Sequence, residues 1–424
     1  MEHSASRQRH FVVVGASLAG LRAVEAARKA GFDGRITLIG AERHLPYDRP
    51  PLSKAYLEPT EDGSSPEVPY FRDDAVFADE LDVTLMLGRS ATALDTADRI
   101  VRVGDVEVPY DMLVIATGAN ARTLPGTDGL AGVHALRTID DAIAVRAALE
   151  SRPRTVVIGA GFVGSEIASN ANKREVPVTV VEALATPLVR AIGPLMGPAI
   201  ASLHARNGTE LRCGVGVDRI EGEGRVERVV LGDGTVLPAD LVVVGIGTIP
   251  AVDWLKDSGV TLDNGVLCDS TLYTGIPGVY AAGDVANWYN PLFERHQRLE
   301  HWTSAAEQGA AAARNALDPA AAVPYSTVPY FWSDWYDSRI QFVGIVDADE
   351  AALVEGDVDV PGKWIALYRK GDRFVGALTV NGRADIMKYR TLLTKRTGWA
   401  DALEFAEKRK LAQAARAVAT ATES

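Results

Sequence analysis

Two stretches of the chain repeat one another, and this repeat restricts the possible folds more than any other feature of the sequence. They are residues 10–42, HFVVVGASLAGLRAVEAARKAGFDGRITLIGAE, and residues 155–183, TVVIGAGFVGSEIASNANKREVPVTVVEA. Each contains a short β-branched apolar run, a glycine turn, an amphipathic stretch of about four helical turns, and a second apolar run ending in a carboxylate. This order predicts two βαβ units, whose glycine turns start 144 residues apart.

The second glycine turn has the spacing of a dinucleotide-binding site. Gly159, Gly161 and Gly164 form GxGxxG between a predicted strand and a predicted helix, and Glu182 follows at the end of the next strand. The first glycine permits the tight turn, the second admits a pyrophosphate to the helix N-terminus, the third allows close packing, and the acid accepts from ribose hydroxyls. Because Glu182 would repel a 2′-phosphate, we expect NADH rather than NADPH. The alternatives are a structural turn and a solvated strand end.

The first glycine turn departs from this pattern. Gly15, Ser17 and Gly20 stand in place of three glycines, and Glu42 supplies the acid. Ser17 puts a side chain where a pyrophosphate would approach, but its hydroxyl can donate to a phosphate oxygen. We therefore predict a second nucleotide site, with a degenerate structural βαβ unit as the alternative. Two such sites on one chain are typical of an enzyme that holds one cofactor tightly and exchanges the other.

The length of 424 residues allows about three domains. Residues 110–119 and 240–250 predict buried strands where the chain crosses between domains, and residues 278–288 predict a strand, a Gly-Asp turn and a helix. From residue 325 the sequence becomes aromatic and strand-like, and Lys370-Gly371-Asp372 predicts a hairpin turn between strands of alternating pattern. We predict an α/β fold with one nucleotide-binding domain at residues 1–112 and 246–324, a second at 113–245, and an α+β domain at 325–424.

Five further motifs carry a resemblance to a known family. They are PYDRPPLSK at residues 46–54, ATGA at 116–119, GVYAAGDVA at 278–286, LEHWTSAAEQG at 299–309 and FWSD at 331–334. In this order they resemble the NADH-dependent ferredoxin reductases of bacterial oxygenase systems, which are putidaredoxin-reductase-like flavoproteins of the glutathione reductase fold. The resemblance implies two Rossmann-like domains, a C-terminal domain that covers the flavin, and the cofactors FAD and NADH.

The resemblance also assigns residues to the flavin. Gly15, Ser17, Gly20 and Glu42 would bind the ADP half, and Asp284 would bind a ribityl hydroxyl. Arg49 and Lys54 would lie nearer the flavin, and the pyrimidine end of the isoalloxazine would be lined by Glu300, His301 and Trp302. The other predicted cofactor-binding residues are Ala116, Thr117, Gly118 and Trp332. For Asp284 the alternative is a cap on the following helix, and for the tryptophans, Trp335 included, it is core packing.

Lys54 and Glu166 form the pair with a mechanistic role. Glu166 is expected on the first turn of the helix that follows the second glycine turn, where a carboxylate also suits the helix dipole. By the resemblance, the two residues face each other beside the flavin N5, so we expect them within salt-bridge distance. Hydride transfer needs no general acid, base or covalent nucleophile, because stacking the two rings supplies most of the catalysis.

The two cysteines limit the alternatives within this fold. Cys213 and Cys268 lie far apart in sequence and form no CxxC, which disfavours a disulfide framework, an iron–sulfur cluster or a cysteine-based zinc site. The histidines show no metal-ligand spacing, so we expect no metal. Disulfide reductases and NADH oxidases need sulfur near the flavin, and no cysteine precedes Cys213. We expect both cysteines to be buried small hydrophobes. A redox-controlled interaction protein like apoptosis-inducing factor is a further alternative.

The charge distribution suggests the electron acceptor. A net charge of −12 disfavours binding to nucleic acid or anionic lipid. Residues 361–424, however, carry 13 Lys+Arg against 6 Asp+Glu, and the ferredoxins of this family, expected to be of the [2Fe–2S] type, are acidic. Docking through Lys388, Arg390, Lys395 and Arg396 is therefore expected, with a solvated face as the alternative. Without a signal-like start or a long apolar stretch, we expect a cytoplasmic protein.

Overall fold

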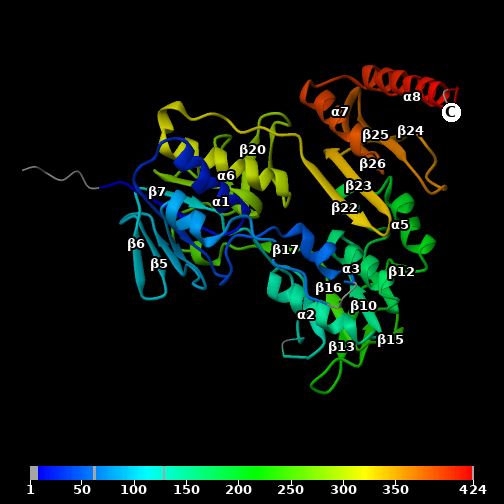
Figure 1. Ribbon diagram of the computed structural model, residues 1–424, viewed down its shortest axis with the longest axis horizontal. Coiled ribbons are helices and arrows are strands. Elements are labelled where there is room, and N and C mark those ends of the chain that lie inside the picture. The colour runs from blue at the N-terminus through cyan, green and yellow to red at the C-terminus, as the bar shows by residue number, and fades with distance from the viewer. Residues whose placement is uncertain (1–7, 61–63, 128, 423–424) are drawn as a thin grey trace, which may run out of the picture. The chain divides into compact units, whose positions relative to one another are not determined.

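The computed structural model describes residues 8–60, 64–127 and 129–422 and divides into two compact units (Figure 1). Unit 1 comprises residues 1–50, 67–120 and 248–327. Unit 2 comprises residues 51–66, 121–247 and 328–424. Within the described ranges, no helix combines the length and the apolar character that crossing a membrane requires.

Unit 1 is built on a five-stranded parallel sheet that contains the first predicted βαβ unit. The strand order is β19-β7-β1-β2-β3. The register is parallel throughout, with Val13 opposite both Leu38 and Val114. The strands are β1 (His10–Val14), β2 (Arg35–Ile39), β3 (Val83–Met86), β7 (Met112–Ile115) and β19 (Val279–Ala281).

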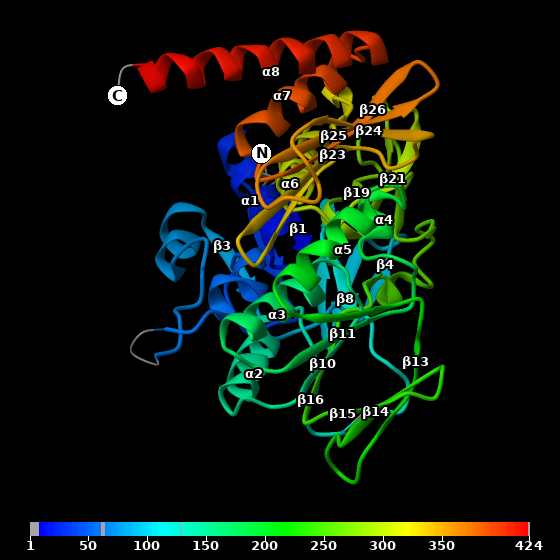
Figure 2. The same cartoon turned by 90° about the vertical axis from the view of Figure 1, so that its right-hand side faces the viewer.

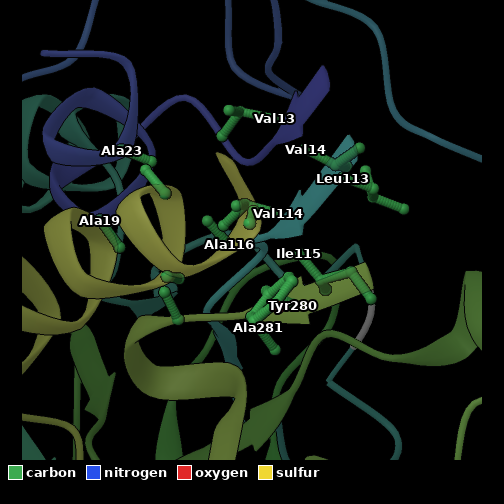
Figure 3. Close-up of a cluster of buried hydrophobic side chains, with 14 of the residues drawn as sticks. Val13, Val14, Ala19, Ala23, Leu113, Val114, Ile115, Ala116, Tyr280 and Ala281 are labelled. Atoms are coloured by element: carbon green, nitrogen blue, oxygen red, sulfur yellow. The ribbon is translucent and has the colours of Figure 1, made fainter. Parts of the chain in front are cut away.

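Two helices pack closely over this sheet because small residues line their contact. They are α1 (Leu18–Lys29) and α6 (Trp302–Leu317). A Cβ atom added at Gly309 of α6 would lie only 2.1 Å from the carbonyl oxygen of Ala19. Figure 3 shows the core beneath them, where Ala19, Ala23 and the apolar side chains of β1, β7 and β19 meet. Burial of this apolar surface drives the folding of the unit.

The predicted helix after Gly283-Asp284 is wrong. A 3₁₀ turn, η5 (Gly283–Val285), leads instead into strand β20 (Ala286–Asn290). This segment, ANWYN, contains aromatic residues that favour a pleated strand, and Trp288 is fully buried there. β20 pairs with β18 (Val266–Cys268) and β21 (Arg295–Arg298).

Unit 1 also holds the meander β4 (Ala93–Asp95), β5 (Ile100–Val103) and β6 (Val106–Pro109), and the short helices η3 (Val76–Glu80), η4 (Asp253–Leu255) and η6 (Pro319–Ala321).

Unit 2 repeats the architecture with a second five-stranded parallel sheet, which confirms the second predicted βαβ unit. The strand order is β12-β11-β10-β16-β9. The strands are β9 (Val133–Ala135), β10 (Thr155–Ile158), β11 (Val178–Glu182), β12 (Glu210–Cys213) and β16 (Leu241–Val244). The helices are α2 (Ile139–Glu150), α3 (Phe162–Lys173), α4 (Val189–Ile192) and α5 (Gly197–Arg206), and the meander is β13 (Val217–Glu221), β14 (Arg228–Leu231) and β15 (Val236–Pro238).

Both βαβ helices are shorter than the sequence suggested. α1 and α3 have 12 residues each, which is about three turns rather than four. The carboxylates also differ in position. Glu182 is the last residue of β11, whereas Glu42 lies in the turn beyond the end of β2.

The C-terminal part of unit 2 is an antiparallel sheet with two helices, α7 (Arg383–Thr394) and α8 (Trp399–Thr422), on one side (Figure 2). The predicted hairpin is confirmed, since Lys370 pairs with Arg373 around Gly371-Asp372. The predicted alternation is wrong, because β25 is buried continuously over its first five residues. One face of β25 packs on α4 and α5. The strands are β22 (Tyr330–Trp335), β23 (Ser338–Gly344), β24 (Glu350–Glu355), β25 (Trp364–Lys370) and β26 (Arg373–Val380).

The chain leaves unit 1 three times. Residues 51–66, which contain the short helix η2 (Ala55–Leu57), pack with unit 2, and residues 50–53 form the turn η1 (Pro50–Ser53) at the crossing. The chain leaves unit 1 again within strand β8 (Ala119–Ala121) and returns to it just before strand β17 (Thr248–Pro250). It leaves for the last time after residue 327. The three-domain boundaries expected from the sequence stay a prediction.

Candidate functional site

The glycine turn of unit 2 needs its first and third glycines for steric reasons. Gly159 has a φ of +100°, and an added Cβ would lie 2.4 Å from the Gly245 carbonyl oxygen. A Cβ at Gly164 would lie 2.0 Å from the carbonyl oxygen of Gly159. At Gly161 the nearest such atom is 3.8 Å away, so this position is open toward whatever approaches the helix.

The glycine turn of unit 1 follows the same rule and explains the presence of Ser17. A Cβ at Gly15 would lie 2.0 Å from the Ala116 carbonyl oxygen, and one at Gly20 would lie 1.9 Å from that of Gly15. Ser17 precedes α1 as Gly161 precedes α3, and both are extended, with φ of −126° and −78°. A side chain is therefore sterically tolerated at the one glycine position in which the two turns differ.

Both turns present a helix N-terminus that suits a phosphate group. The first turns of α1 and α3 contain no acidic residue, and no side chain caps either helix. The amides there are left for an anion, which the helix dipole also favours. The expectation that Glu166 lies on the first turn of α3 is wrong: it is the fifth residue of the helix, and it points into a buried environment. Its place is therefore set by packing rather than by the dipole.

The two predicted ribose acceptors are held by hydrogen bonds. Glu182 accepts from the backbone N–H of Ala160, within the glycine turn, at 2.8 Å, and from that of Leu184 at 2.9 Å. These bonds fix the carboxylate against the turn that would hold the dinucleotide. Each carboxylate oxygen keeps a further lone pair with which it can accept from a ribose hydroxyl.

In unit 1, Glu42 lies at the centre of a polar cluster. It accepts from the hydroxyl of Tyr47 at 2.5 Å and from the guanidinium of Arg49 at 2.5 Å. Arg49 also donates to the hydroxyl of Ser17 at 3.3 Å, and its guanidinium lies over the Tyr47 ring. The structure thus places Arg49 beside the residues predicted for the ADP half of FAD. Sequence reasoning missed Tyr47, although it stands inside the quoted PYDRPPLSK motif.

Except for Lys54 and Trp332, which belong to unit 2, the other residues predicted for the flavin also lie in unit 1. Glu300 accepts from Thr248 at 2.6 Å and pairs with Arg298, whose guanidinium also donates to the carbonyl of Asp284 at 3.0 Å. Burial lowers the pKa of His301 to about 4, although the carboxylates of Asp284 and Glu300 favour the charged form. His301 is therefore neutral at physiological pH. Because β20 follows Asp284, a helix-capping role for this residue is excluded.

Two more predicted residues are held by long-range bonds within unit 1. Trp302 begins α6, and its indole N–H donates to Asp48 at 2.7 Å, which joins the 299–309 motif to the 46–54 motif. Thr117 donates to the carbonyl of Ala251 at 2.8 Å, beside Gly118, whose φ is +67°. Bonds within unit 1 therefore link the 46–54, 278–286 and 299–309 motifs, whereas the FWSD motif belongs to unit 2.

Unit 2 contains the predicted ion pair. The Nζ atom of Lys54 lies 2.8 Å from Oε1 of Glu166, and the Glu166 side chain is only 2% exposed. Both serine hydroxyls nearby also bind this carboxylate: that of Ser53, and that of Ser333 at 2.5 Å. Asn170 donates to the carbonyl oxygens of Ser53 and Glu166. The pair is confirmed; its predicted role is not tested by these distances.

The tryptophans divide into two kinds. Trp335 is fully buried in the core of the C-terminal sheet, which favours the core-packing alternative for this residue. Trp332 is only partly buried, stacks with Tyr330 at a centroid distance of 5.8 Å and has the guanidinium of Arg339 over its ring. Trp332 is therefore less buried than Trp335 and lies between an aromatic and a cationic neighbour.

Neither cysteine belongs to a redox pair. Cys268 is buried in unit 1, and burial raises the pKa of its thiol. Cys213, expected to be buried, is only half-buried: it ends β12 opposite Glu182 and lines an open hollow of about 670 Å³. The pKa of its thiol is raised by burial and by Glu182, so the thiolate is disfavoured. Among the residues that the structure describes, no cluster of His, Cys, Asp and Glu could hold a metal ion.

Comparison with known proteins agrees with this arrangement. Residues 9–309 match the family described as pyridine nucleotide-disulphide oxidoreductase, and residues 330–415 match the family described as reductase C-terminal. Rhodocoxin reductase of Rhodococcus erythropolis is 36% identical over 386 residues, which cover 90% of this chain and 89% of the relative. The ferredoxin–NAD(+) reductase component of the anthranilate 1,2-dioxygenase system of Burkholderia cepacia is 38% identical over 389 residues, covering 90% and 93%.

Solved structures extend the likeness to three dimensions. The crystal structure of the covalent putidaredoxin reductase–putidaredoxin complex contains a chain that matches with a TM-score of 0.85 at 33% identity. The match covers 92% of this chain and 93% of that one. The predicted fold, two dinucleotide-binding sheets followed by a C-terminal α+β part, is confirmed by this match and by the two family matches.

Proposed function

The chain belongs to the pyridine nucleotide-disulphide oxidoreductase family, and on that premise we propose that it oxidises NADH and passes the electrons singly to an iron–sulfur ferredoxin of an oxygenase system. The observation that carries the proposal is the likeness, over 90% of the chain, to relatives named as ferredoxin reductases of such systems. A cytoplasmic location belongs to the same proposal, because NADH is the reductant of that compartment.

The residues of unit 1 would hold FAD. The open turn at Ser17, the free amides of α1 and the acceptor Glu42 suit a pyrophosphate and a ribose. Bound there, FAD would accept a hydride and release its electrons one at a time. Arg49 would contribute positive charge beside the pyrophosphate. Asp284, Glu300, His301, Trp302, Ala116, Thr117 and Gly118 remain proposed contacts of the ribityl and ring portions.

The residues of unit 2 would hold NADH. Gly161 and the amides of α3 would receive the pyrophosphate, and Glu182 would accept from the adenosine ribose. The hollow at the end of β12 lies on the Glu182 side of this turn and would accommodate the adenine. Lys54 and Glu166 would mark the nicotinamide end, where the lysine ammonium can stabilise negative charge left by the transferred hydride.

The sulfur-dependent alternatives have little support. A disulfide reductase passes electrons from flavin to a close dithiol, and a single-cysteine oxidase or peroxidase needs a reactive thiol. Cys213 and Cys268 are in different units of the molecule, and the pKa of each thiol is raised. Electrons would therefore leave from the flavin itself.

The electron acceptor distinguishes the proposal from a redox-controlled interaction protein. NADH should bleach the flavin of the anaerobic holoenzyme within seconds, and a [2Fe–2S] ferredoxin should then restore the flavin absorbance and support cytochrome c reduction. The control is cytochrome c without ferredoxin, which should be reduced at least about tenfold more slowly. Slow bleaching together with no effect of any ferredoxin in a panel would favour the interaction protein and reject the reductase.

Docking of the ferredoxin on the basic C-terminal surface is a second part of the proposal. Lys388, Lys395 and Arg396 are exposed at α7 and the turn after it. Arg390 differs, because it is partly buried and donates to the carbonyl of Val328. We therefore define the basic surface as Lys388, Lys395 and Arg396, and propose that it attracts an acidic partner.

A further inference from the structure

The carboxylate of Glu166 is surrounded by hydrogen-bond donors. Lys54 and the hydroxyl of Ser333 both reach its Oε1, at 2.8 and 2.5 Å, while the hydroxyl of Ser53 reaches Oε2. The backbone N–H of Asp334 is also near Oε1, at 3.4 Å. A protonated carboxyl would need an acceptor for its own hydrogen, whereas an ionised one accepts from every neighbour. The contacts thus fit a carboxylate held at both oxygens.

The direction of the Ser333 hydroxyl is fixed by a second residue. The indole N–H of Trp335 donates to Ser333 Oγ at 2.9 Å. An indole nitrogen can only donate, so the hydroxyl must use a lone pair for Trp335 and its single hydrogen for Glu166. Ser333 and Trp335 are both fully buried, and water does not compete for these bonds. The result is a one-way chain of donors from Trp335 through Ser333 to Glu166.

This chain matters because the end of a glutamate side chain is otherwise loosely defined. The terminal torsion of Glu has a broad energy minimum, so the position of Oε1 depends on its partners. Lys54 contacts that same oxygen, and its own stem has several rotatable bonds. A hydroxyl that fixes Oε1 therefore also fixes the lysine ammonium.

From these contacts we propose that Ser333 is a positioning residue for hydride transfer. Its hydroxyl, oriented by Trp335, holds Glu166 and through it Lys54 in the geometry that the reaction needs. Strand β22 of the C-terminal part thereby contributes to the nicotinamide end of unit 2 without touching substrate. The inference rests on the proposed function, since it assigns Ser333 to the site of NADH oxidation.

The test uses the FAD-loaded full chain in anaerobic stopped-flow mixing with NADH. We expect Ser333→Ala to lower the limiting rate of flavin reduction about tenfold, the usual scale for one charge-assisted hydrogen bond, while the NADH dissociation constant stays within about twofold. Ser338→Ala is the matched control. Ser338 lies on the neighbouring strand and its hydroxyl bonds to Asp337, so its rate should equal that of the wild type.

A double-mutant cycle separates positioning from general structure. If Ser333 acts only through Glu166, adding Ser333→Ala to Glu166→Gln should change the rate by less than about twofold. Ser333→Cys leaves no cavity and supplies a weaker donor, so it should have an intermediate rate, which covers the case of a poorly folded alanine variant. A wild-type rate in Ser333→Ala, or a full additional loss on the Glu166→Gln background, would overturn the inference alone. Failure of NADH to reduce the wild-type flavin would overturn the proposed function together with it.

Discussion

The ammonium of Lys54 lies 2.8 Å from the carboxylate of Glu166 inside unit 2. Lys54 belongs to residues 51–66, whose flanking segments, up to 50 and from 67, belong to unit 1. Arg146 of α2 is buried and donates to the carbonyls of Tyr56 and Glu58 at 2.9 and 2.6 Å, so these bonds hold residues 51–66 against α2. The lysine is therefore carried by the nucleotide-binding unit that also carries Glu166.

Removing Lys54 should lower the stability of the protein more than removing Glu166. Lys54→Met leaves a carboxylate buried without its cation, which costs about 3 kcal/mol. Glu166→Gln leaves a lysine that is 19% exposed and can reach water, so its cost is about 1 kcal/mol. Thermal unfolding should show the larger loss for Lys54→Met. Equal losses would mean that the buried carboxylate is not the dominant factor.

Both variants should slow flavin reduction by NADH. Each removes a charge that orders the proposed site, so we expect the limiting rate to fall about 10- to 100-fold while flavin content is retained. Lys173→Met is the control, because Lys173 of α3 forms an exposed ion pair with Glu58, which belongs to residues 51–66 like Lys54. If the control variant were as slow as Lys54→Met, the loss of rate would come from disturbing residues 51–66 as a whole rather than from removing the ion pair.

The glycine turns predict an order of tolerance. Gly164→Ala would force a Cβ to 2.0 Å from a backbone oxygen, so this variant should lose several degrees of thermal stability or fail to fold. Gly161→Ala meets nothing closer than 3.8 Å and should fold normally, with weaker binding of NADH as its main defect. Titration of NADH into both proteins, after a folding check by circular dichroism, tests the order.

Ser17→Gly in unit 1 is the reverse of Gly161→Ala, because it removes a side chain at the equivalent position. It should leave the fold intact, because glycine occupies the same position before α3. It should also retain FAD, measured as flavin fluorescence released on dialysis, to within about threefold of the wild type, because backbone amides supply most of the phosphate contacts. Complete loss of flavin from Ser17→Gly would show that the hydroxyl is essential.

The sequence was informative wherever a local pattern dictated the backbone. The glycine spacing at Gly15 and Gly159, the β-branched strands beside them and the hairpin at Gly371 were predictable, because each depends on a few adjacent residues. The helix expected after Asp284 was wrong because the structure of that segment is not determined locally. The local turn is real, but the following segment is drawn into a sheet by the burial of Trp288, which depends on partners distant in sequence.

Side-chain networks were harder to predict than positions. Lys54 and Glu166 were paired through family resemblance, yet Ser53 and Ser333 were missed although both stand in quoted motifs. A serine has no periodicity or spacing that reveals its hydrogen-bond partner. The continuous burial of β25 was also missed, because it depends in part on α4 and α5, which are distant in sequence.

Glu182 should determine the preference for NADH over NADPH. Glu182→Ala removes the ribose acceptor and the repulsion of a 2′-phosphate, so the ratio of kcat/KM for NADH to that for NADPH should fall about tenfold or more. Glu210→Ala on the adjacent strand is the matched control, since Glu210 is exposed and bonds to Thr179 and Arg212. An unchanged ratio in Glu182→Ala would reassign Glu182 to bracing the glycine turn.

Charge reversal on the basic surface should affect only the second half of the reaction. Replacing Lys388, Lys395 and Arg396 by Glu should slow ferredoxin reduction about tenfold at low salt, with the difference shrinking at high salt. NADH oxidation with ferricyanide should be unchanged. Lys408→Glu is the control, because the Lys408 side chain is exposed on α8. Equal ferredoxin rates in all variants would leave these residues as a solvated surface.

Histidine 204 should make the stability of unit 2 sensitive to mild acid. His204 is fully buried, and its ring bonds to the hydroxyls of Tyr336 and Ser165 and packs on Trp335. Burial lowers the pKa of His204 from 6.5 to about 4. As the pH falls below about 6.5, the unfolded chain binds a proton at this residue before the folded chain does.

The free energy of unfolding should therefore fall between about pH 6.5 and pH 4 and stop falling from this cause below pH 4, a total of roughly 3 kcal/mol. None of the three side chains against His204 is charged in this range. His301 in unit 1 titrates similarly, but it is present in both proteins compared. His204→Gln, which cannot take up a proton, should lose less thermal stability than the wild type between pH 7 and pH 5. Parallel losses in the two proteins would mean that protonation of His204 does not control the acid response of unit 2.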